Sequence, residues 1–259
     1  MNSGIFVSLT AADVAVSREK WVKLAPSEAT PEAARAVMKA SRFDVLPVDD
    51  GVAVEWYFRT RKWNDYAEIE RERIRGADIL APDTPFRDVL RGMALEERLF
   101  YFIADRHAVL GLLSVANLNR RQVKVYLYGL LCDLEVELSE LVARSLPHEA
   151  IVAFALKKEA ESSVLEEGVR HSASEGVDEH PVNRLYLGDL VDIARNHGLH
   201  RHVHYTDKEF KKALDPIVKL RNAVAHPVNP LITAVRGVRD LQQRMVDMED
   251  AIFRLRHCC

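Results

Sequence analysis

The sequence has little cysteine and no long run of apolar residues. Three cysteines among 259 residues, Cys132 and the terminal pair Cys258 and Cys259, give neither a disulfide framework nor the ligand spacing of a zinc site. No stretch approaches the roughly 18 apolar residues of a membrane-spanning helix, and residues 1–20 lack a basic segment followed by an apolar one. We therefore expect a cytoplasmic protein with reduced thiols and no membrane contact. The terminal cysteine pair is read as a frayed helix end, with lipidation as the alternative.

Several catalytic motifs are also missing. The sequence has no Gly-rich phosphate loop, no nucleophile elbow and no pair of carboxylates arranged for acid–base work, which argues against the corresponding enzyme classes.

The charge of the chain is unevenly distributed: residues 195–259 carry 12 Lys+Arg against 7 Asp+Glu, and residues 1–194 carry 24 Lys+Arg against 32 Asp+Glu. A local basic excess attracts polyanions, although a solvated helix face would show the same composition.

The first half of the chain contains an internal repeat. "TPEAARAVM" begins at Thr30 and "TPFRDVLRGM" begins at Thr84, and each reads as a Thr N-cap, a Pro at the first helical position and an apolar-periodic helix. Each is followed by a β-rich run, an acidic turn and a second β-rich run. Aligning Val48-Asp49 with Ala104-Asp105 gives nearly the offset of the two Thr-Pro pairs. The sequence therefore predicts a duplicated helix–strand–strand unit.

The duplicated region, roughly residues 1–120, resembles a pair of CBS domains, α/β modules that stack as two pseudo-symmetric halves and often bind adenosine nucleotides in the cleft between them. The most informative segment is "GLLSVANLN", which has the family's glycine, two apolar residues, a hydroxyl residue and, three further on, Asp or Asn. The resemblance implies that Gly111, Ser114 and Asn117 form the nucleotide site. It also implies ATP, AMP or S-adenosylmethionine as a regulatory ligand.

The first repeat departs from this pattern. Glu55 stands where the glycine should lie, and no acidic partner follows Thr60, so we expect at most one working nucleotide site. For Ser114 the alternative is a plain helix N-cap that needs no ligand. Between the repeats, aromatic and apolar residues recur at helical spacing from Trp63 to Ile69 within a charged stretch, and we expect them to pack against a core.

The remainder, residues 121–259, is predicted to be an all-α bundle of about five helices. "GVRHSASEGVDEHP" reads as a loop, "TDKE" at Thr206 as a capping box, and Asn229 with Pro230 as the start of the last helix. One continuous apolar seam marks the first helix of this region. It consists of Leu127, Leu131, Leu134, Leu138 and Leu141.

The motif "RNAVAH" places polar residues where packing alone would favour apolar ones. At about 100° per residue, Arg221 falls within about 20° of the apolar Phe210, so it points along the buried stripe of its helix. A buried cation without a partner costs several kcal/mol, so Arg221 needs either a carboxylate or a water-filled cleft. Asn222 and His226 are four residues apart and lie one above the other. Pro227 biases His226 out of helical geometry, which places the imidazole at a helix C-terminus.

At these residues the sequence resembles the HEPN family of small, generally dimeric helical bundles. The family signature is an arginine, a polar residue directly after it and a histidine four to six residues past the arginine; "LGDLVDIARNHG" upstream is similar as well. Many catalytic members are metal-independent endoribonucleases, some of them toxins. The resemblance implies that Arg221 stabilises phosphate charge, Asn222 orients the histidine or the substrate, and His226 transfers protons. It also implies RNA as the partner, a homodimer, and no cofactor for cleavage.

Two alternatives stay open for this region. Arg221 could pair with Glu135 or Glu137 while Asn222 and His226 cap the end of their helix, in which case the bundle would be a non-catalytic module that dimerises or docks a partner. Control by nucleotidylation, which in related toxins modifies a tyrosine two residues after the histidine, is disfavoured because Val228 occupies that position.

The segment "HGLHRHVH" adds a group of histidines upstream of the motif. A zinc or nickel site at His200, His202 and His204 is disfavoured because no cysteine or carboxylate supports it. A basic loop beside a polyanion cleft is the preferred interpretation. The predicted fold is thus an α/β CBS pair followed by an all-α HEPN-like bundle.

Overall fold

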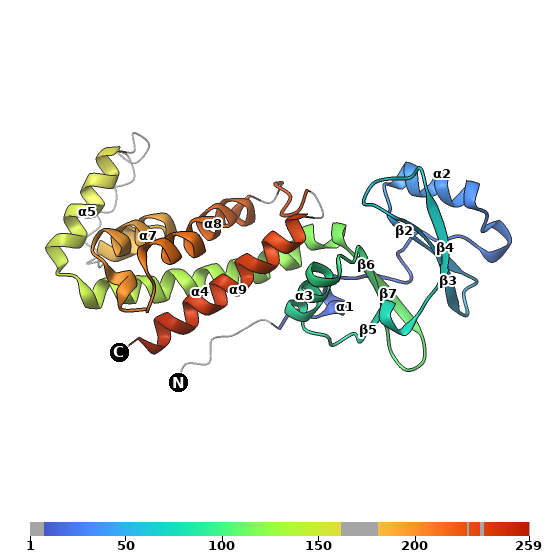
Figure 1. The fold of residues 1–259 in the computed structure, drawn as a ribbon, viewed down its shortest axis with the longest axis horizontal. Coiled ribbons are helices and arrows are strands. Elements are labelled where there is room, and N and C mark those ends of the chain that lie inside the picture. Colours follow the sequence, from blue (N-terminus) through green and yellow to red (C-terminus); the bar gives the residue numbers. More distant parts are fainter. Residues whose placement is uncertain (1–7, 162–180, 227, 234–235, 259) are drawn as a thin grey trace, which may run out of the picture. The chain divides into compact units, whose positions relative to one another are not determined.

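The computed structural model describes residues 8–161, 181–226, 228–233 and 236–258, and these form two compact units. Unit 1 contains Met1–Tyr126 and Pro227–Gln243, and unit 2 contains Leu127–His226 and Arg244–Cys259. The strands of the described chain belong to unit 1, and unit 2 is helical (Figure 1). Along the chain, the division between the units falls within α4 (Arg121–Ser145), a few residues beyond the predicted boundary at 120, and again before Pro227 and within α9 (Arg236–His257).

Unit 1 contains two antiparallel-rich sheets, with strand orders β1-β7-β6-β5 and β2-β3-β4. The strands are β1 (Val16–Ser17), β2 (Val45–Asp49), β3 (Val54–Thr60), β4 (Ile69–Arg73), β5 (Ile79–Leu80), β6 (Phe100–Ala104) and β7 (Val109–Ser114). Its helices are α1 (Ala11–Val14), α2 (Pro31–Ser41) and α3 (Phe86–Glu96), and short 3-10 turns lie at η1 (Pro26–Glu28), η2 (Gly76–Asp78) and η3 (Val115–Asn119).

The two halves of unit 1 repeat each other in detail. Helix α2 starts at Pro31 and α3 at Phe86, 55 residues later, and both helices end at a residue in the left-handed region, Arg42 (φ 56°) and Glu97 (φ 53°). The hairpins β2–β3 and β6–β7 share the same register shift at their fourth residue pair. The predicted helix–strand–strand repeat is therefore present in the structure.

The strand register corrects the predicted alignment by one residue. Gly111 pairs with Ile103, and the matching pair in the first hairpin is Trp56 with Val48, so Trp56 and not Glu55 corresponds to Gly111. By the same register, Arg59 takes the place that Ser114 has in the second repeat. The prediction aligned Asp49 with Asp105, but the matching turn residue is Asp50: Asp50 and Asp105 each accept from the N–H groups two and three residues further on.

The first strands of the two repeats are exchanged between the sheets. β1 precedes α2 yet pairs with β7, and β4 precedes α3 yet pairs with β3. The stretch from Trp63 to Ile69 is not helical and leads into β4. Tyr66 and Ile69 nevertheless pack against a buried apolar cluster, as predicted. Salt bridges Arg61–Glu70 and Arg73–Glu55 across β3 and β4 stabilise the strand.

Helix α3 begins one residue later than predicted. Its N-cap is Pro85 and not Thr84, whereas α2 is capped as predicted, with Thr30 accepting a hydrogen bond from Ala33 N at 3.2 Å. An isolated antiparallel bridge pairs Pro85 with Thr10 and keeps the residues before α3 extended.

Two apolar clusters form part of the core of unit 1. Tyr57 lies at the centre of one, with its ring centroid 5.2 Å from that of Phe100 and 5.3 Å from that of Phe102. The other cluster packs α2 on its sheet through Leu24, Ala34, Met38, Leu46, Val48 and Phe58. Aromatic pairs of this kind add about 0.5–1.5 kcal/mol each beyond the area that they bury.

In the described residues unit 2 comprises most of α4, α5 (His148–Glu161), α7 (Leu187–Asn196), α8 (Asp207–Ala225) and the C-terminal part of α9, with 3-10 turns η4 (Pro181–Arg184) and η5 (Leu199–Arg201) (Figure 1). The predicted leucine seam of α4 is buried throughout. Thr206 and Glu209 form the predicted capping box, and α8 continues through Pro216 without a break. The loop predicted over residues 168–181 lies, except for Pro181, outside the described residues.

The last helix starts later than predicted, at Arg236 and not near Asn229. Asn119 binds both the N–H and the carbonyl of Ile232, at 2.9 and 3.0 Å, and Lys124 Nζ donates to Asn229 O at 2.6 Å. These side chains bind backbone groups of an irregular segment of turns and bends, so those groups do not need helical partners. No helix in the described part of the chain has the length and apolar character needed to cross a bilayer.

Candidate functional site

A cavity of about 590 Å³ lies within unit 1, where the sequence predicts a nucleotide site. Its volume is in the range of small-molecule sites. The walls come from three parts of unit 1: the segment around β1, the residues joining α2 to β2, and the end of β7 with the turn after it. Ser114 and Asn117 both line it.

Ser114 and Asn117 are hydrogen-bonded to each other, and the NH₂ group of Asn117 is left for a ligand. The backbone N–H and the hydroxyl of Ser114 both donate to Asn117 Oδ1, at 2.7 and 3.1 Å. Because a backbone N–H can only donate, the amide oxygen must face it, and the NH₂ group of Asn117 points away. Ser114 occupies the N-cap position of η3, and Asn117 forms a capping box with it by accepting from Ser114 N. The plain N-cap alternative for Ser114 therefore stays open.

Gly111 is not among the residues that line the cavity, so its predicted role at the nucleotide site stays a prediction. A Cβ at this position would lie 2.7 Å from the carbonyl oxygen of Val16. Gly111 pairs with Ser17 across β1 and β7, so the close approach of the β1 backbone explains the glycine.

The lining combines cations with an aromatic ring. Lys20, Arg42 and Arg120 contribute positive charge, and the Phe43 ring is partly exposed (37%) at the wall. On the acidic side, burial raises the pKa of Asp44, whose carboxylate accepts hydrogen bonds from Thr60 Oγ1 and Asn64 N. A phosphate and a flat heterocycle would both find complementary groups here.

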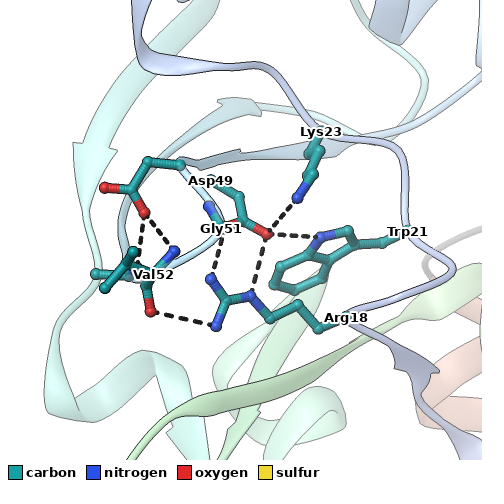
Figure 2. Close-up of polar contacts among 8 residues, drawn as sticks. Arg18, Trp21, Lys23, Asp49, Gly51 and Val52 are labelled. Atoms are coloured by element: carbon teal, nitrogen blue, oxygen red, sulfur yellow. Dashed lines mark hydrogen bonds and ion pairs between the residues drawn. The ribbon is translucent and has the colours of Figure 1, made fainter.

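A buried carboxylate holds one wall of the cavity in place (Figure 2). The side chain of Asp49 is fully buried and accepts hydrogen bonds from Arg18 Nη2 at 2.6 Å, Arg18 Nε at 3.1 Å, Lys23 Nζ at 3.1 Å and Trp21 Nε1 at 3.3 Å. The hydrogen bonds that Arg18 donates keep the pKa of Asp49 well below its usual range, against the opposing effect of burial. Trp21 lines the cavity, so Asp49 anchors the wall that carries it. Sequence reasoning missed this cluster.

The repeat-related position in unit 1 holds a second cavity of about 340 Å³ with a different lining. Arg59 stands where Ser114 does in the other repeat, and its Nε is buried without a hydrogen-bond partner among the described residues. Arg98 pairs with Asp78 at 3.0 Å nearby. This cavity therefore lacks the hydroxyl–amide pair of the first.

In unit 2, the predicted arginine lies on the inner side of α8 but is not neutralised by a carboxylate. Arg221 is half-buried, and its Cζ lies 5.4 Å from the ring centroid of Tyr186. Among the described residues it forms no ion pair. The pKa of the Tyr128 hydroxyl and the pKa of the Cys132 thiol, both on α4, are raised. The chief cause is the neighbouring Cys132 for Tyr128 and burial for Cys132, and the charge of Arg221 opposes both shifts.

The two carboxylates considered as partners for Arg221 are engaged elsewhere. Glu135 accepts a hydrogen bond from the backbone N–H of Leu187 at 2.9 Å, and Glu137 forms an ion pair with Arg256 of α9 at 2.5 Å. The alternative in which either one neutralises Arg221 is therefore wrong.

Asn222 and His226 are exposed at the C-terminal end of α8. His226 has left helical geometry (φ −99°, ψ 105°), and its N–H donates to Asn222 O at 3.2 Å. Pro227, from which this geometry was predicted, lies outside the described residues. Around the helix, Arg221 and His226 are about 140° apart, so the motif presents its arginine toward α4 and α7 and its imidazole toward solvent.

The upstream histidines are spread over different environments. His200 is buried with its ring 5.9 Å from that of Phe210, whereas His202 and His204 are exposed. The described residues contain no group of three or more His, Cys, Asp or Glu side chains able to hold a metal ion.

In comparisons with known proteins, no protein-family model and no curated protein matches the chain.

Proposed function

We propose that the protein is a metal-independent endoribonuclease of the HEPN type whose activity responds to an adenosine nucleotide bound in unit 1. Unit 2 binds and cuts RNA as a homodimer, with one copy of the arginine–histidine motif supplied by each subunit. Unit 1 is a CBS-like pair that senses the nucleotide.

The observation that carries the nuclease proposal is the state of Arg221. A half-buried guanidinium without an ion-pair partner in the described residues keeps its N–H donors available for a phosphate. His226 is exposed at the C-terminal end of α8. An anion-binding cation and an exposed acid–base group are the two requirements for cleaving RNA without a metal ion.

The chemistry follows from these groups. The ribose 2′-oxygen attacks the adjacent phosphorus and the bond from phosphorus to the 5′-oxygen breaks, which leaves a 2′,3′-cyclic phosphate and a 5′-hydroxyl. His226 of one subunit removes the proton from the 2′-hydroxyl and that of the other returns a proton to the leaving oxygen. Arg221 stabilises the charge that grows on the phosphate, and Asn222 orients the imidazole or the substrate.

The test is cleavage of single-stranded RNA by the full chain in excess EDTA, with product ends identified by mass. We expect His226→Ala to lower the rate by about 10²–10⁴-fold and Arg221→Ala to lower it by at least about 10²-fold. Because His226 is exposed, its variant should melt close to the parent. His257→Ala, which changes an exposed histidine at the end of α9 in the same unit, is the matched control and should keep full activity.

A non-catalytic docking or dimerisation module is the second candidate. The wide separation of Arg221 and His226 around α8 favours it, since a single subunit does not bring the two groups together. A parent protein that cuts no RNA under any condition, combined with an unchanged oligomeric state in both variants, would support this module and reject the nuclease.

The sensor part of the proposal is supported by the cavity of unit 1, where Ser114, Asn117 and nearby cations surround about 590 Å³. Calorimetric titration with ATP, AMP and S-adenosylmethionine tests it. We expect one of them to bind, and Ser114→Ala combined with Asn117→Ala to weaken binding by about tenfold or more. Unaltered binding by this double variant would place the ligand elsewhere.

A further inference from the structure

Two tyrosine rings lie exposed near the Arg221 guanidinium. Tyr186 is 57% exposed and Tyr128 is 54% exposed, whereas the apolar residues that flank them, Leu185, Leu187 and Leu127, are buried. Rings of this size usually gain stability by burial, so two open rings beside one cation are an uncommon use of aromatic residues. Together, Tyr128, Tyr186 and Arg221 are called the stacking surface below.

The backbone at both tyrosines is held in place by the surrounding structure. The N–H of Tyr186 donates to Asp189 Oδ2 at 3.2 Å, and the next N–H, that of Leu187, donates to Glu135 Oε1 at 2.9 Å. Tyr128 stands in the middle of the long helix α4. Because this backbone is ordered before a ligand arrives, only the side chains have to be ordered on binding, which lowers the entropy cost.

The ligand that fits combines an anion with a flat ring. Arg221 forms no ion pair among the described residues and rests against the Tyr186 ring at 5.4 Å, an arrangement that leaves guanidinium N–H groups for a phosphate. Exposed phenol rings stack on nucleobases without regard to their sequence. A nucleotide with an unpaired base supplies both the phosphate and the ring, whereas bases in a duplex are already stacked inside the helix.

We propose that Tyr128 and Tyr186 bind nucleobases next to the phosphate held by Arg221, and so make single-stranded RNA the substrate of the site. This inference rests on the proposed nuclease function and specifies its substrate. The tyrosines are specificity residues: they select unpaired bases, and proton transfer remains with His226.

The experiment measures binding of the full chain to a labelled, unstructured 2′-O-methyl RNA, which cannot be cleaved because its 2′-oxygen is blocked. The same measurement is made with an abasic strand of equal length and with a duplex. We expect the parent to prefer the unstructured strand, and Tyr128→Ala and Tyr186→Ala each to weaken that binding by about tenfold. Binding of the abasic strand should not change, and the Tyr→Phe variants should bind like the parent because they keep the ring.

Phe253→Ala removes a ring of unit 2 that is 61% exposed on α9 and serves as the matched control; its RNA affinity should stay the same. If the parent cuts RNA but both Tyr→Ala variants bind and cut it like the parent, the stacking surface is rejected and the nuclease stands. If the Tyr→Ala variants lose only self-association in sedimentation, the surface belongs to a second copy of the chain, and the inference is wrong. A parent that neither binds nor cuts single-stranded RNA rejects both proposals.

Discussion

Replacing Asp49 by asparagine removes the charge at the centre of the best-connected polar cluster in unit 1. Both carboxylate oxygens accept: Oδ1 binds Arg18 Nη2 and the N–H of Gly51, and Oδ2 binds Arg18 Nε, Lys23 Nζ and Trp21 Nε1. In either orientation, an asparagine NH₂ group would face at least two N–H donors. The variant therefore loses hydrogen bonds and also creates donor–donor contacts (Figure 2).

The size of the effect follows from burial. Removing one partner of a buried ion pair costs about 3–5 kcal/mol when the remaining charge stays dry. Here the Asp49 side chain is fully buried, but Arg18 is 20% exposed and Lys23 is 45% exposed, so water can recover part of their solvation. We expect a loss of about 2–3 kcal/mol, equivalent to a fall in Tm of roughly 4–12 °C for a chain of this size.

The assay is thermal unfolding followed by circular dichroism at several pH values. Because the folded pKa of Asp49 is lowered, its contribution is fully present above the ordinary carboxyl pKa of about 4 and is lost as the pH falls below it. The difference in Tm between parent and variant should be constant above about pH 5 and shrink in more acidic solution.

Asp50→Asn is the matched control. Asp50 is exposed in the same turn and accepts from the N–H groups of Val52 and Ala53 through one oxygen, which asparagine retains. Its variant should melt close to the parent. An Asp49→Asn protein that melts within about 1 °C of the parent at neutral pH would refute the reasoning that this cluster stabilises unit 1.

Three further outcomes are expected, each measured by thermal unfolding. Gly111→Ala should destabilise the protein by more than about 1 kcal/mol because its Cβ would meet Val16 O at 2.7 Å, whereas Gly76→Ala, with nothing within 4 Å, should not; equal melting would contradict the close approach of β1. Thr206→Ala should cost about 1 kcal/mol through loss of the α8 capping box, and Thr206→Ser should restore most of it. Tyr205→Phe should cost about 1–2 kcal/mol because Asp250 loses the 2.7 Å hydrogen bond from the phenol; a neutral result would mean that water replaces it.

The sequence was most informative where local signals decide the structure. The capping box at Thr206, the buried seam of α4 and the two hairpins follow from hydrogen-bonding side chains and apolar periodicity, and all are present. The start of α9 could not be predicted in this way. It depends on Asn119 and Lys124, which are over a hundred residues away from the segment that they bind.

At the candidate sites too, local features could be predicted from the sequence and long-range contacts could not. That Arg221 lies along the inner face of α8 follows from helix geometry, but whether a carboxylate neutralises it depends on how Glu135 and Glu137 are used by α7 and α9. The link between Asp49 and Arg18 likewise joins residues that share no pattern in the sequence. Pairs of polar groups that are distant in the sequence form only when the chain folds, so local propensity does not predict them.

The exchange of β1 and β4 between the two sheets makes each repeat incomplete by itself. A fragment holding only the first repeat would keep α2, β2 and β3 but lose β4, and the outer edge of β3 would then expose its backbone N–H and carbonyl groups. Separately expressed halves should accordingly aggregate alone and reconstitute when mixed, as complementary fragments do. For the same reason, an ancestral single copy of this unit would have folded only as a homodimer, and gene fusion would have joined the two subunits in one chain.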